Sequence, residues 1–408
     1  MVEGSGVKDI SNPFGALRRA DVAAFALLAL VVPWISLFAP RVLGGVLPIA
    51  ALLAVAGHYW AHRSFAPMEK GPWLAISLAV TLCLLSALWS AHPLFVLDRS
   101  SRVAGSLVTA VLLFFTAASL DEAERASLRP LLLWSTVFGL ALTAANMLMH
   151  GGIYELVASR KALEAGVEVG TNRPMVVLVV FVWPAMVAAS ESGWKRLALV
   201  LPVATFAVST LTDSQTAFTA AIIGLLVYGI ARLSPRFAGF AVTWGGVALI
   251  LAMPAIILTL KHFDPNIRFD WPQASAGARL EIWYAVASAI PHSLWIGHGI
   301  EATRFVEDWH MAHLYFPEKS VLHPHNGALQ VWYEFGAVGA VLASWLWFVM
   351  ARRASALAGS MRATALACMT VVLVVSCVSH GLWQSWWLGA VGLVPALFAM
   401  AGKRTELA

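Results

Sequence analysis

Charged residues are scarce in this sequence. They make up 12% of the 408 residues, whereas 60% of the residues are hydrophobic. A soluble globular domain has about 25% charged and about 45–50% apolar residues. The core of a soluble protein does not absorb this much apolar sequence, but a lipid bilayer does. The composition therefore excludes an ordinary soluble enzyme and predicts an integral membrane protein.

Cysteine and an N-terminal apolar leader are also lacking. The three cysteines, Cys83, Cys368 and Cys377, lie in apolar runs without metal-like spacing, so we expect small core residues. The residues before Asp21 are polar and contain no apolar segment of the kind found in a cleaved signal peptide. We therefore expect the first membrane span to act as its own signal anchor.

Twelve apolar runs are present, each of about the length that crosses a bilayer as a helix. They cover 22–40, 42–60, 73–90, 103–119, 131–149, 174–190, 196–211, 216–233, 238–260, 326–350, 361–379 and 384–401. Only Thr212 to Gln215 separate the seventh run from the eighth, which predicts a tight helical hairpin. The predicted fold is an all-α polytopic integral membrane protein with about twelve transmembrane helices in a single membrane domain, residues 1–408.

Lysine and arginine predict the orientation, because they are enriched in the cytoplasmic loops of membrane proteins. With the N-terminus inside, every cytoplasmic segment is short and carries at least two of these cations. An even number of spans then places the C-terminus inside as well. The sequence thus predicts a multi-pass protein of the bacterial inner membrane with both termini cytoplasmic. These loops account for the formal net charge of +5, which does not indicate nucleic acid as a partner.

Two long segments, 150–173 and 261–325, then lie on the periplasmic side, and the second forms a large periplasmic loop. Ten of the twelve histidines fall on this side. Within the loop, we expect 276–290 to form a short amphipathic helix at the membrane interface, with Trp283 as an anchor. Polar chemistry is therefore concentrated on the periplasmic face.

The middle of the spans lacks charge. No span has Lys, Arg or Asp near its centre, and Glu334 is the only carboxylate clearly inside one. Coupled transporters usually need such a group at mid-depth. This pattern disfavours a coupled transporter and leaves an uncoupled flippase open.

The segment from His323 to Gly339 closes the large loop and opens the tenth span. Pro324 favours an extended entry, and Asn326 is a suitable helix N-cap. His325 would then lie at the mouth of the helix, facing solvent, where a neutral imidazole can accept a proton from a sugar hydroxyl. His323 would orient the substrate or assist this base. The alternative is an interfacial histidine followed by glycines that only pack against a neighbouring helix.

The segment resembles the signature of the O-antigen ligase and polymerase superfamily, which reads His-Asn, then Leu, Glu and two glycines. The matching residues are His325, Asn326, Leu329, Glu334, Gly336 and Gly339. Three further segments resemble the family: Trp89 to Pro93, Asn172 to Pro174, and Arg279 to Trp283 followed by Gly297-His298-Gly299. About twelve spans and a large periplasmic loop just before the motif also fit.

The resemblance implies a histidine base, here His325, and arginines of the periplasmic loops that hold the diphosphate of an undecaprenyl-linked glycan. Arg279 and Arg173 suit this role because guanidinium binds phosphate bidentately and stays charged. Many relatives also have a cation at the turn between spans seven and eight, where this chain has Gln215. Arg173, Arg268 or Arg279 must then supply the charge, or the donor is handled differently.

The resemblance implies metal-independent, inverting glycan transfer at the periplasmic face, without a cofactor. The donor would be an undecaprenyl-diphosphate-linked glycan and the acceptor lipid A-core, as in an O-antigen ligase. A polymerase that uses a second lipid-linked glycan as acceptor, a protein glycosyltransferase and a lipid-linked sugar flippase stay open. His310 and His313 are three residues apart, but no carboxylate or cysteine pattern completes a metal site around them.

Overall fold

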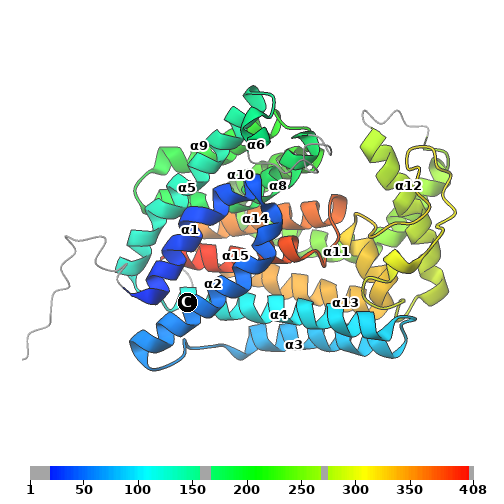
Figure 1. Ribbon diagram of the computed structural model, residues 1–408, viewed down its shortest axis with the longest axis horizontal. Helices are drawn as coiled ribbons and strands as arrows, with labels where there is room; N and C mark the ends of the chain where they lie inside the picture. The colour runs from blue at the N-terminus through cyan, green and yellow to red at the C-terminus, as the bar shows by residue number, and fades with distance from the viewer. Residues whose placement is uncertain (1–18, 157–166, 268–273, 404–408) are drawn as a thin grey trace, which may run out of the picture.

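The chain folds as an all-α membrane bundle. The computed structural model describes residues 19–156, 167–267 and 274–403, which form helices and no strand (Figure 1). Its principal helices are α1 (Ala20–Phe38), α2 (Leu43–His62), α3 (Lys70–Leu85), α4 (Pro93–Ala118), α5 (Glu122–Leu148), α8 (Val167–Glu191), α9 (Lys195–Ser209), α10 (Gln215–Leu233), α11 (Pro235–Phe263), α12 (Ala274–Ala289), α13 (Gly327–Ala356), α14 (Gly359–Val378) and α15 (Ser385–Ala401). Short helical turns, α6 (Gly152–Glu155), η2 (Pro40–Val42), η3 (Ser86–Leu88), η4 (Ile290–Ser293) and η5 (Ala302–Phe305), lie between them.

Each of the twelve expected spans corresponds to a helix. Within the described residues, ten helices are long and apolar enough to cross a membrane. The other two expected spans are the shorter helices α9, with 15 residues, and α15, with 17. Because α9 and α10 are joined by residues 210–214 alone, the predicted tight hairpin is confirmed. The chain is thus a polytopic membrane protein.

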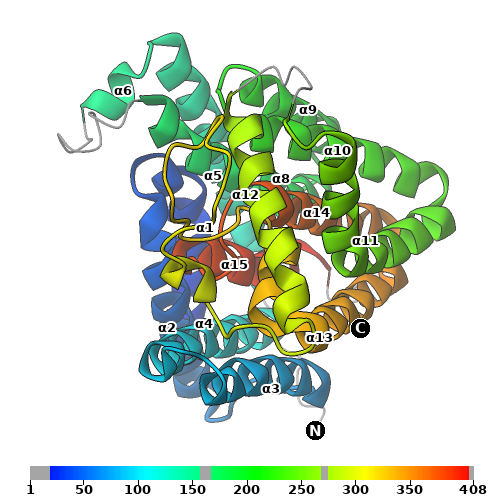
Figure 2. The same ribbon diagram turned by 90° about the vertical axis from the view of Figure 1, so that its right-hand side faces the viewer.

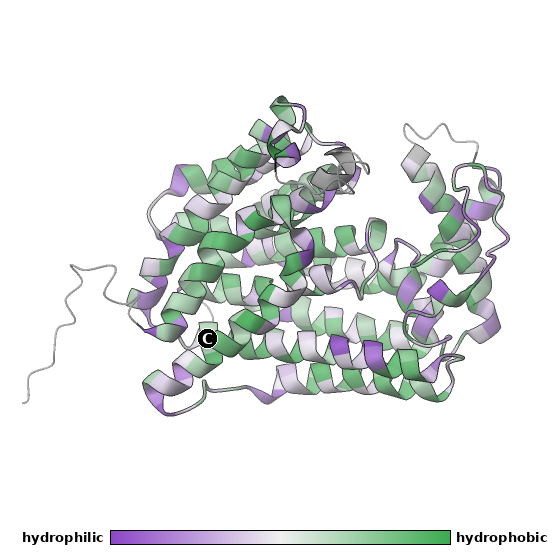
Figure 3. Cartoon of the chain, in the orientation of Figure 1, coloured by the Kyte–Doolittle hydropathy of each residue, from purple (hydrophilic) through white to green (hydrophobic). Residues whose placement is uncertain are grey.

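The two ends of the bundle differ. The segment from α12 to the start of α13 covers one end, here called the loop end, and the C-terminus lies at the other, the opposite end (Figure 1). Hydrophilic residues gather at both ends and in the connecting segments, while the long helices are mostly hydrophobic (Figure 3). At the opposite end, Arg129 donates to the carbonyls of Ala401 and Gly402 that close α15. An arginine there compensates carbonyls that lack helical partners.

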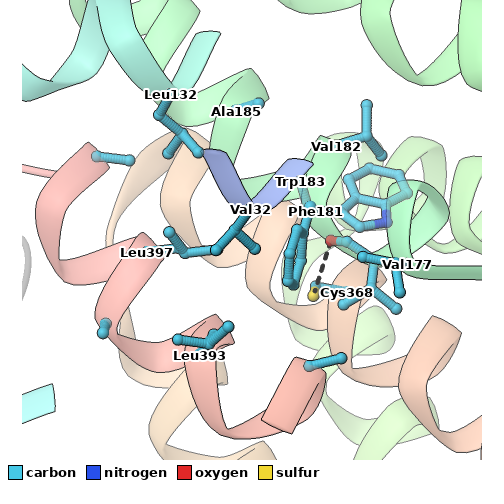
Figure 4. Close-up of a cluster of buried hydrophobic side chains, with 14 of the residues drawn as sticks. Val32, Leu132, Val177, Phe181, Val182, Trp183, Ala185, Cys368, Leu393 and Leu397 are labelled. Carbon is cyan, nitrogen blue, oxygen red and sulfur yellow. Dashed lines mark hydrogen bonds between the residues drawn. The ribbon is translucent and has the colours of Figure 1, made fainter. Parts of the chain in front are cut away.

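Helix α8 is the centre of the bundle. Almost every residue from Met175 to Ala189 is buried on all sides, as expected for a helix that is apolar around its whole circumference. Phe181 and Trp183 pack against α14 and its neighbours, and Cys368 of α14 points toward the carbonyl of Val180 (Figure 4). The prediction that the cysteines are core residues is confirmed, because all three are buried.

Helix α12 runs across the loop end instead of along the bundle (Figure 2). The expectation of an amphipathic interfacial helix is wrong in one respect, because buried residues lie all around α12, among them Leu280, Glu281, Ile282, Tyr284 and Val286. Trp283 is partly buried, and its indole Nε1 donates to the carbonyl of Pro324 at 2.9 Å. Helix α12 therefore belongs to the protein core of the loop end.

Helix α13 is broken in its third turn. Gly336 has φ 60° and ψ −153°, a conformation outside the helical region. The amides of Ala337 and Val338 donate to the carbonyls of Leu294 and Trp295, at 2.8 and 3.1 Å. In exchange, the carbonyls of Tyr333 and Glu334 accept from the amides of His298 and Gly299, at 3.0 and 2.8 Å. The segment 294–299 thus satisfies the backbone groups that the break leaves without helical partners.

This exchange corrects the interpretation of the glycines as helix-packing residues. A Cβ on Gly336 would overlap the backbone of Trp295, and a Cβ on Gly297, where φ is +64°, would overlap the backbone of Glu334. Gly336 and Gly297 therefore lie on opposite sides of the same backbone contact. Both are required for backbone to approach backbone.

We predict that Gly336→Ala destabilises the protein. The conformation at Gly336 is nearly exclusive to glycine and costs another residue about 1–3 kcal/mol, before the overlap with Trp295. The thermal midpoint of the purified protein in detergent should fall. The matched control is Gly245→Ala in α11, where an added Cβ meets nothing within 4 Å. Equal midpoints for the two variants would contradict this account of the break.

Candidate active site

His325 occupies a constrained position just before α13. Its φ is +53°, an unusual value for a residue with a side chain. The Asn326 side chain accepts from the amide of Leu329 at 3.0 Å, which confirms the predicted N-cap. On the other side, the bond from Trp283 fixes Pro324 against α12. The imidazole is thus held from both sides of the chain, and it is half-buried instead of facing solvent freely.

The tautomer of His325 follows from its partner. The Nδ1 atom forms a short hydrogen bond with the backbone carbonyl of Ser379. Since a carbonyl oxygen only accepts, Nδ1 must carry the proton, and the lone pair of the neutral ring is left on Nε2. Burial lowers the pKa of His325, and the charge of Arg279 lowers it further, against the carbonyl bond, which raises it. The ring is therefore neutral near pH 7, with Nε2 able to accept a proton.

His323 is held beside His325 in a fixed orientation. The two ring centroids lie 4.2 Å apart. Trp386 donates to the side-chain oxygen of Gln384 at 2.7 Å, which turns the Gln384 amide nitrogen toward His323 Nε2 at 2.8 Å. Burial, with neighbouring cationic groups including Arg173, lowers the pKa of His323 to about 3. His323 is thus a neutral neighbour that accepts a hydrogen bond, and this favours orientation over proton transfer.

Two arginines from separate helices converge on these histidines. Arg173 lies at the start of α8 and its guanidinium carbon is 5.8 Å from the ring centroid of Trp386. Arg279 projects from α12. Burial and the charges of both arginines hold the pKa of His380 well below its usual value. The loop end therefore brings two guanidinium groups close to neutral imidazoles, an arrangement suited to an anion.

Gln215 is the first residue of α10 and lies beside Arg279. It lines one cleft together with Arg279, Trp283 and Val378. Its neighbour Ser214 caps α10 and donates to the side-chain oxygen of Asn172, next to Arg173, at 2.6 Å. The neutral amide is thus near the guanidinium groups that would compensate for its missing charge. The third candidate for this role, Arg268, lies outside the described residues.

Glu334 is a fully buried link between α13 and the segment 379–384. Its carboxylate accepts from Gln330 at 2.8 Å and from the indole of Trp383 at 2.6 Å. Gln330 in turn accepts from the amide of Leu382 at 3.0 Å. This segment begins with the Ser379 carbonyl that holds His325. Glu334 therefore acts at a distance from the imidazole, by fixing the segment that orients it.

Sequence reasoning missed several residues of this site. The Ser379 carbonyl is a backbone group and has no signal in the residue types. Gln384 and Trp386 were not singled out as site residues, and both Trp386 and Trp387 are buried. Arg41, in the short turn between α1 and α2, is close enough to Arg173 to repel its charge. Arg41 could have been found as a single arginine in a short connection on the predicted outer side.

Other polar groups of the loop end have partners of their own. Glu301 pairs with both Arg99 and Arg304. His310 lies beside Asp308 and His313 contacts the carbonyl of Phe316, and neither histidine is in a helix. Glu301 is buried, and after burial itself the nearby His325 and Arg304 lower the pKa of His323, whereas His310 and His313 are exposed.

We predict that Glu334 and Trp383 are energetically coupled. Removing the carboxylate in Glu334→Leu leaves the buried indole N–H without a partner, so adding Trp383→Phe should cost less than it does in the native protein. A double-mutant cycle on unfolding in detergent should give a coupling of about 1–3 kcal/mol. Trp387→Phe is the control, because the Trp387 indole bonds to Ser376 and not to Glu334. Strict additivity of Glu334→Leu and Trp383→Phe would refute the link.

Known proteins of one kind are similar to this chain. The sequence model described as O-antigen ligase matches residues 197–344, from α9 into α13. Proteins named "Putative polysaccharide ligase" are similar to this chain: one from Rickettsia conorii is 22% identical over 350 residues, 81% of each chain, and one from Rickettsia prowazekii is 22% identical over 313 residues, 75% of each. One from Rickettsia felis is 25% identical over 232 residues, 54% of this chain, so the match spans about half, 55%, of that protein. The chain is thus similar to proteins named polysaccharide ligases, and residues 197–344 match the O-antigen ligase model.

Proposed function

We propose that this protein transfers a glycan from a lipid diphosphate to a hydroxyl acceptor. The observation that carries the proposal is the neutral His325, with its Nε2 lone pair available, beside the guanidinium groups of Arg279 and Arg173. A base and a diphosphate-binding pair in one place are what this transfer requires. The similarity to the O-antigen ligase model and to proteins named polysaccharide ligases supports the same reaction class.

The proposed mechanism is a single displacement. His325 Nε2 takes the proton of the acceptor hydroxyl as its oxygen attacks the anomeric carbon of the glycan. The bond between that carbon and the diphosphate oxygen breaks, and the configuration at the carbon inverts. Arg279 and Arg173 bind the diphosphate, which leaves with the electron pair, and stabilise its developing charge. Holding donor and acceptor together contributes the rest of the acceleration.

The protonated His325 that results is compensated locally. The Ser379 carbonyl accepts from Nδ1 in both the neutral and the cationic state, so the ring keeps its orientation through the reaction. The diphosphate brought by the donor offsets the positive charges of Arg173 and Arg279, which otherwise oppose protonation of the ring. The base is therefore weak in the empty site and stronger when the donor is bound.

The donor we propose is an undecaprenyl-diphosphate-linked glycan, and the acceptor is lipid A-core, as in an O-antigen ligase. No metal or cofactor takes part in this mechanism. The loop end would face the periplasm of a bacterial inner membrane, with both termini in the cytoplasm. The distribution of lysine and arginine supports this orientation.

We predict that His325→Ala abolishes transfer. Loss of a general base costs about 10²- to 10⁴-fold in rate. The assay uses purified protein in detergent with undecaprenyl-diphosphate glycan, without nucleotide or divalent metal. Lipid A-core and a second lipid-linked glycan are offered separately. The control is His310→Ala, because the His310 side chain is 89% exposed and lies outside the cluster around His325.

The products distinguish the alternatives. A lipid A-core product that depends on His325 supports the ligase, whereas longer lipid-linked chains alone indicate a polymerase. Transport without covalent change, unaffected by His325→Ala, would indicate a flippase and overturn the proposal.

Since the pKa of His325 is lowered, the neutral base persists as pH falls through 6.5. The acid limb of free-enzyme activity, kcat/KM, should therefore lie below that pH.

A further inference from the structure

A second cluster of ligand-type side chains lies at the opposite end of the bundle, away from His325. Asp21 comes from the first turn of α1, and His58 and His62 come from the last turns of α2. One ligand atom from each of the three lies within 4.8 Å of the other two. Asp21 is fully buried, His58 is nearly so and His62 is exposed. Two helices thus present three metal-ligand groups at one point.

The local sequence explains this convergence. His58 and His62 are four residues apart and therefore share one face of α2, the spacing of paired histidine metal ligands on a helix. Their ring centroids are 4.4 Å apart. Gly57 lets α1 approach this face, because a Cβ there would overlap the backbone of Ala20 and Asp21. The carboxylate of Asp21 is consequently held 3.6 Å from Nδ1 of His58.

A single guanidinium group occupies the centre of the cluster. Arg19 pairs with Asp21 at 2.5 Å and also with Glu124 of α5. Its Nη2 lies 2.7 Å from Nε2 of His62. Because guanidinium has no lone pair, His62 must accept with its ring nitrogen. The lone pairs of two carboxylates and an imidazole therefore already point at one cation.

Among the described residues, Arg19 places one positive charge where two carboxylates meet. Asp21 and Glu124 are buried carboxylates, and Arg19 supplies one positive charge between them, with Asp121 near enough to add its own negative field. A dication would match the two carboxylates directly. Imidazole nitrogen with carboxylate oxygen is a ligand set that suits zinc and the neighbouring transition metals.

We propose that Asp21, His58 and His62, with Glu124 as a fourth ligand, bind a divalent transition metal ion such as Zn²⁺ in place of the Arg19 guanidinium. Zinc takes four such ligands at about 2.0–2.2 Å, so the cluster must contract around the ion. The side chains of Arg19 and His62 are partly exposed and can move, while Asp21 and His58 are held by packing. The ion would join α1, α2 and α5 at the end of the bundle remote from the proposed transfer site.

The test is a titration of the full-length purified chain with Zn²⁺ alone. The protein carries no polyhistidine tag and is stripped with a chelator first. We expect a tight site for one ion per chain. Its affinity should fall by at least about tenfold in His62→Ala, since even indirect supports of metal ligands cost about 10–100-fold when lost. Arg19→Gln should tighten binding, because it removes the competing cation while keeping a side chain of similar length.

Two controls separate this site from the histidines of the loop end. His262→Ala and His325→Ala should each leave the tight site unchanged. Cobalt(II), bound in place of zinc, should give visible absorption that His62→Ala and Asp21→Asn abolish. Zinc affinity that is the same in His62→Ala and the native protein would overturn the proposal. So would the absence of a tight site in a folded Arg19→Gln protein.

Discussion

The exchange of backbone hydrogen bonds between the broken helix α13 and the segment 294–299 is the contact on which the loop end depends. A membrane helix cannot leave its backbone groups unpaired in hydrocarbon, so a break persists only where protein supplies the missing partners. Here Leu294, Trp295, His298 and Gly299 supply them. The break therefore fixes the large loop onto the span that follows it. The first glycine of each signature, Gly336 and Gly297, is explained by this one contact.

The consequences of this contact reach His325 through Glu334. The carbonyl of Glu334 is part of the exchange, while its carboxylate binds Gln330 and Trp383 and so holds the segment that supplies the Ser379 carbonyl. The imidazole thus has a fixed tautomer without a carboxylate partner. A carboxylate would raise the pKa of the ring strongly and favour its protonated form, whereas a neutral carbonyl orients the ring with a smaller increase in its pKa. Nearby guanidinium groups make the site cationic, as the proposed anionic donor requires.

Much of the fold was predictable from the sequence, because hydropathy and helix length are local properties. The twelve expected spans all correspond to helices, and Asn326 is the expected N-cap. The break at Gly336 was not predictable in this way, since hydropathy treats 326–350 as one continuous run and the compensating bonds come from residues far away in sequence. The burial of α12 was missed for a similar reason. Its apolar residues were assigned to lipid, but they pack against the rest of the loop end.

The candidate site was predictable in its residue types and less so in its geometry. His325, Arg173 and Arg279 were singled out by motif and chemistry, yet they come from the mouth of α13, the start of α8 and the middle of α12. Nothing in their spacing indicates that the three converge. Gln215 stands where many relatives have a cation. It shares a cleft with Arg279, whose guanidinium group can supply the missing positive charge. The Ser379 carbonyl that orients His325 is a backbone group, so the residue type at 379 does not predict it.

The most direct measurement is a cryo-EM structure of the protein with undecaprenyl diphosphate bound, because it locates the leaving group independently of any acceptor. We expect the diphosphate to lie between the guanidinium groups of Arg173 and Arg279, with Nε2 of His325 facing the space where the anomeric carbon would be attacked. A diphosphate bound instead at Arg99 and Arg304, with His325 turned away from it, would contradict the central claim.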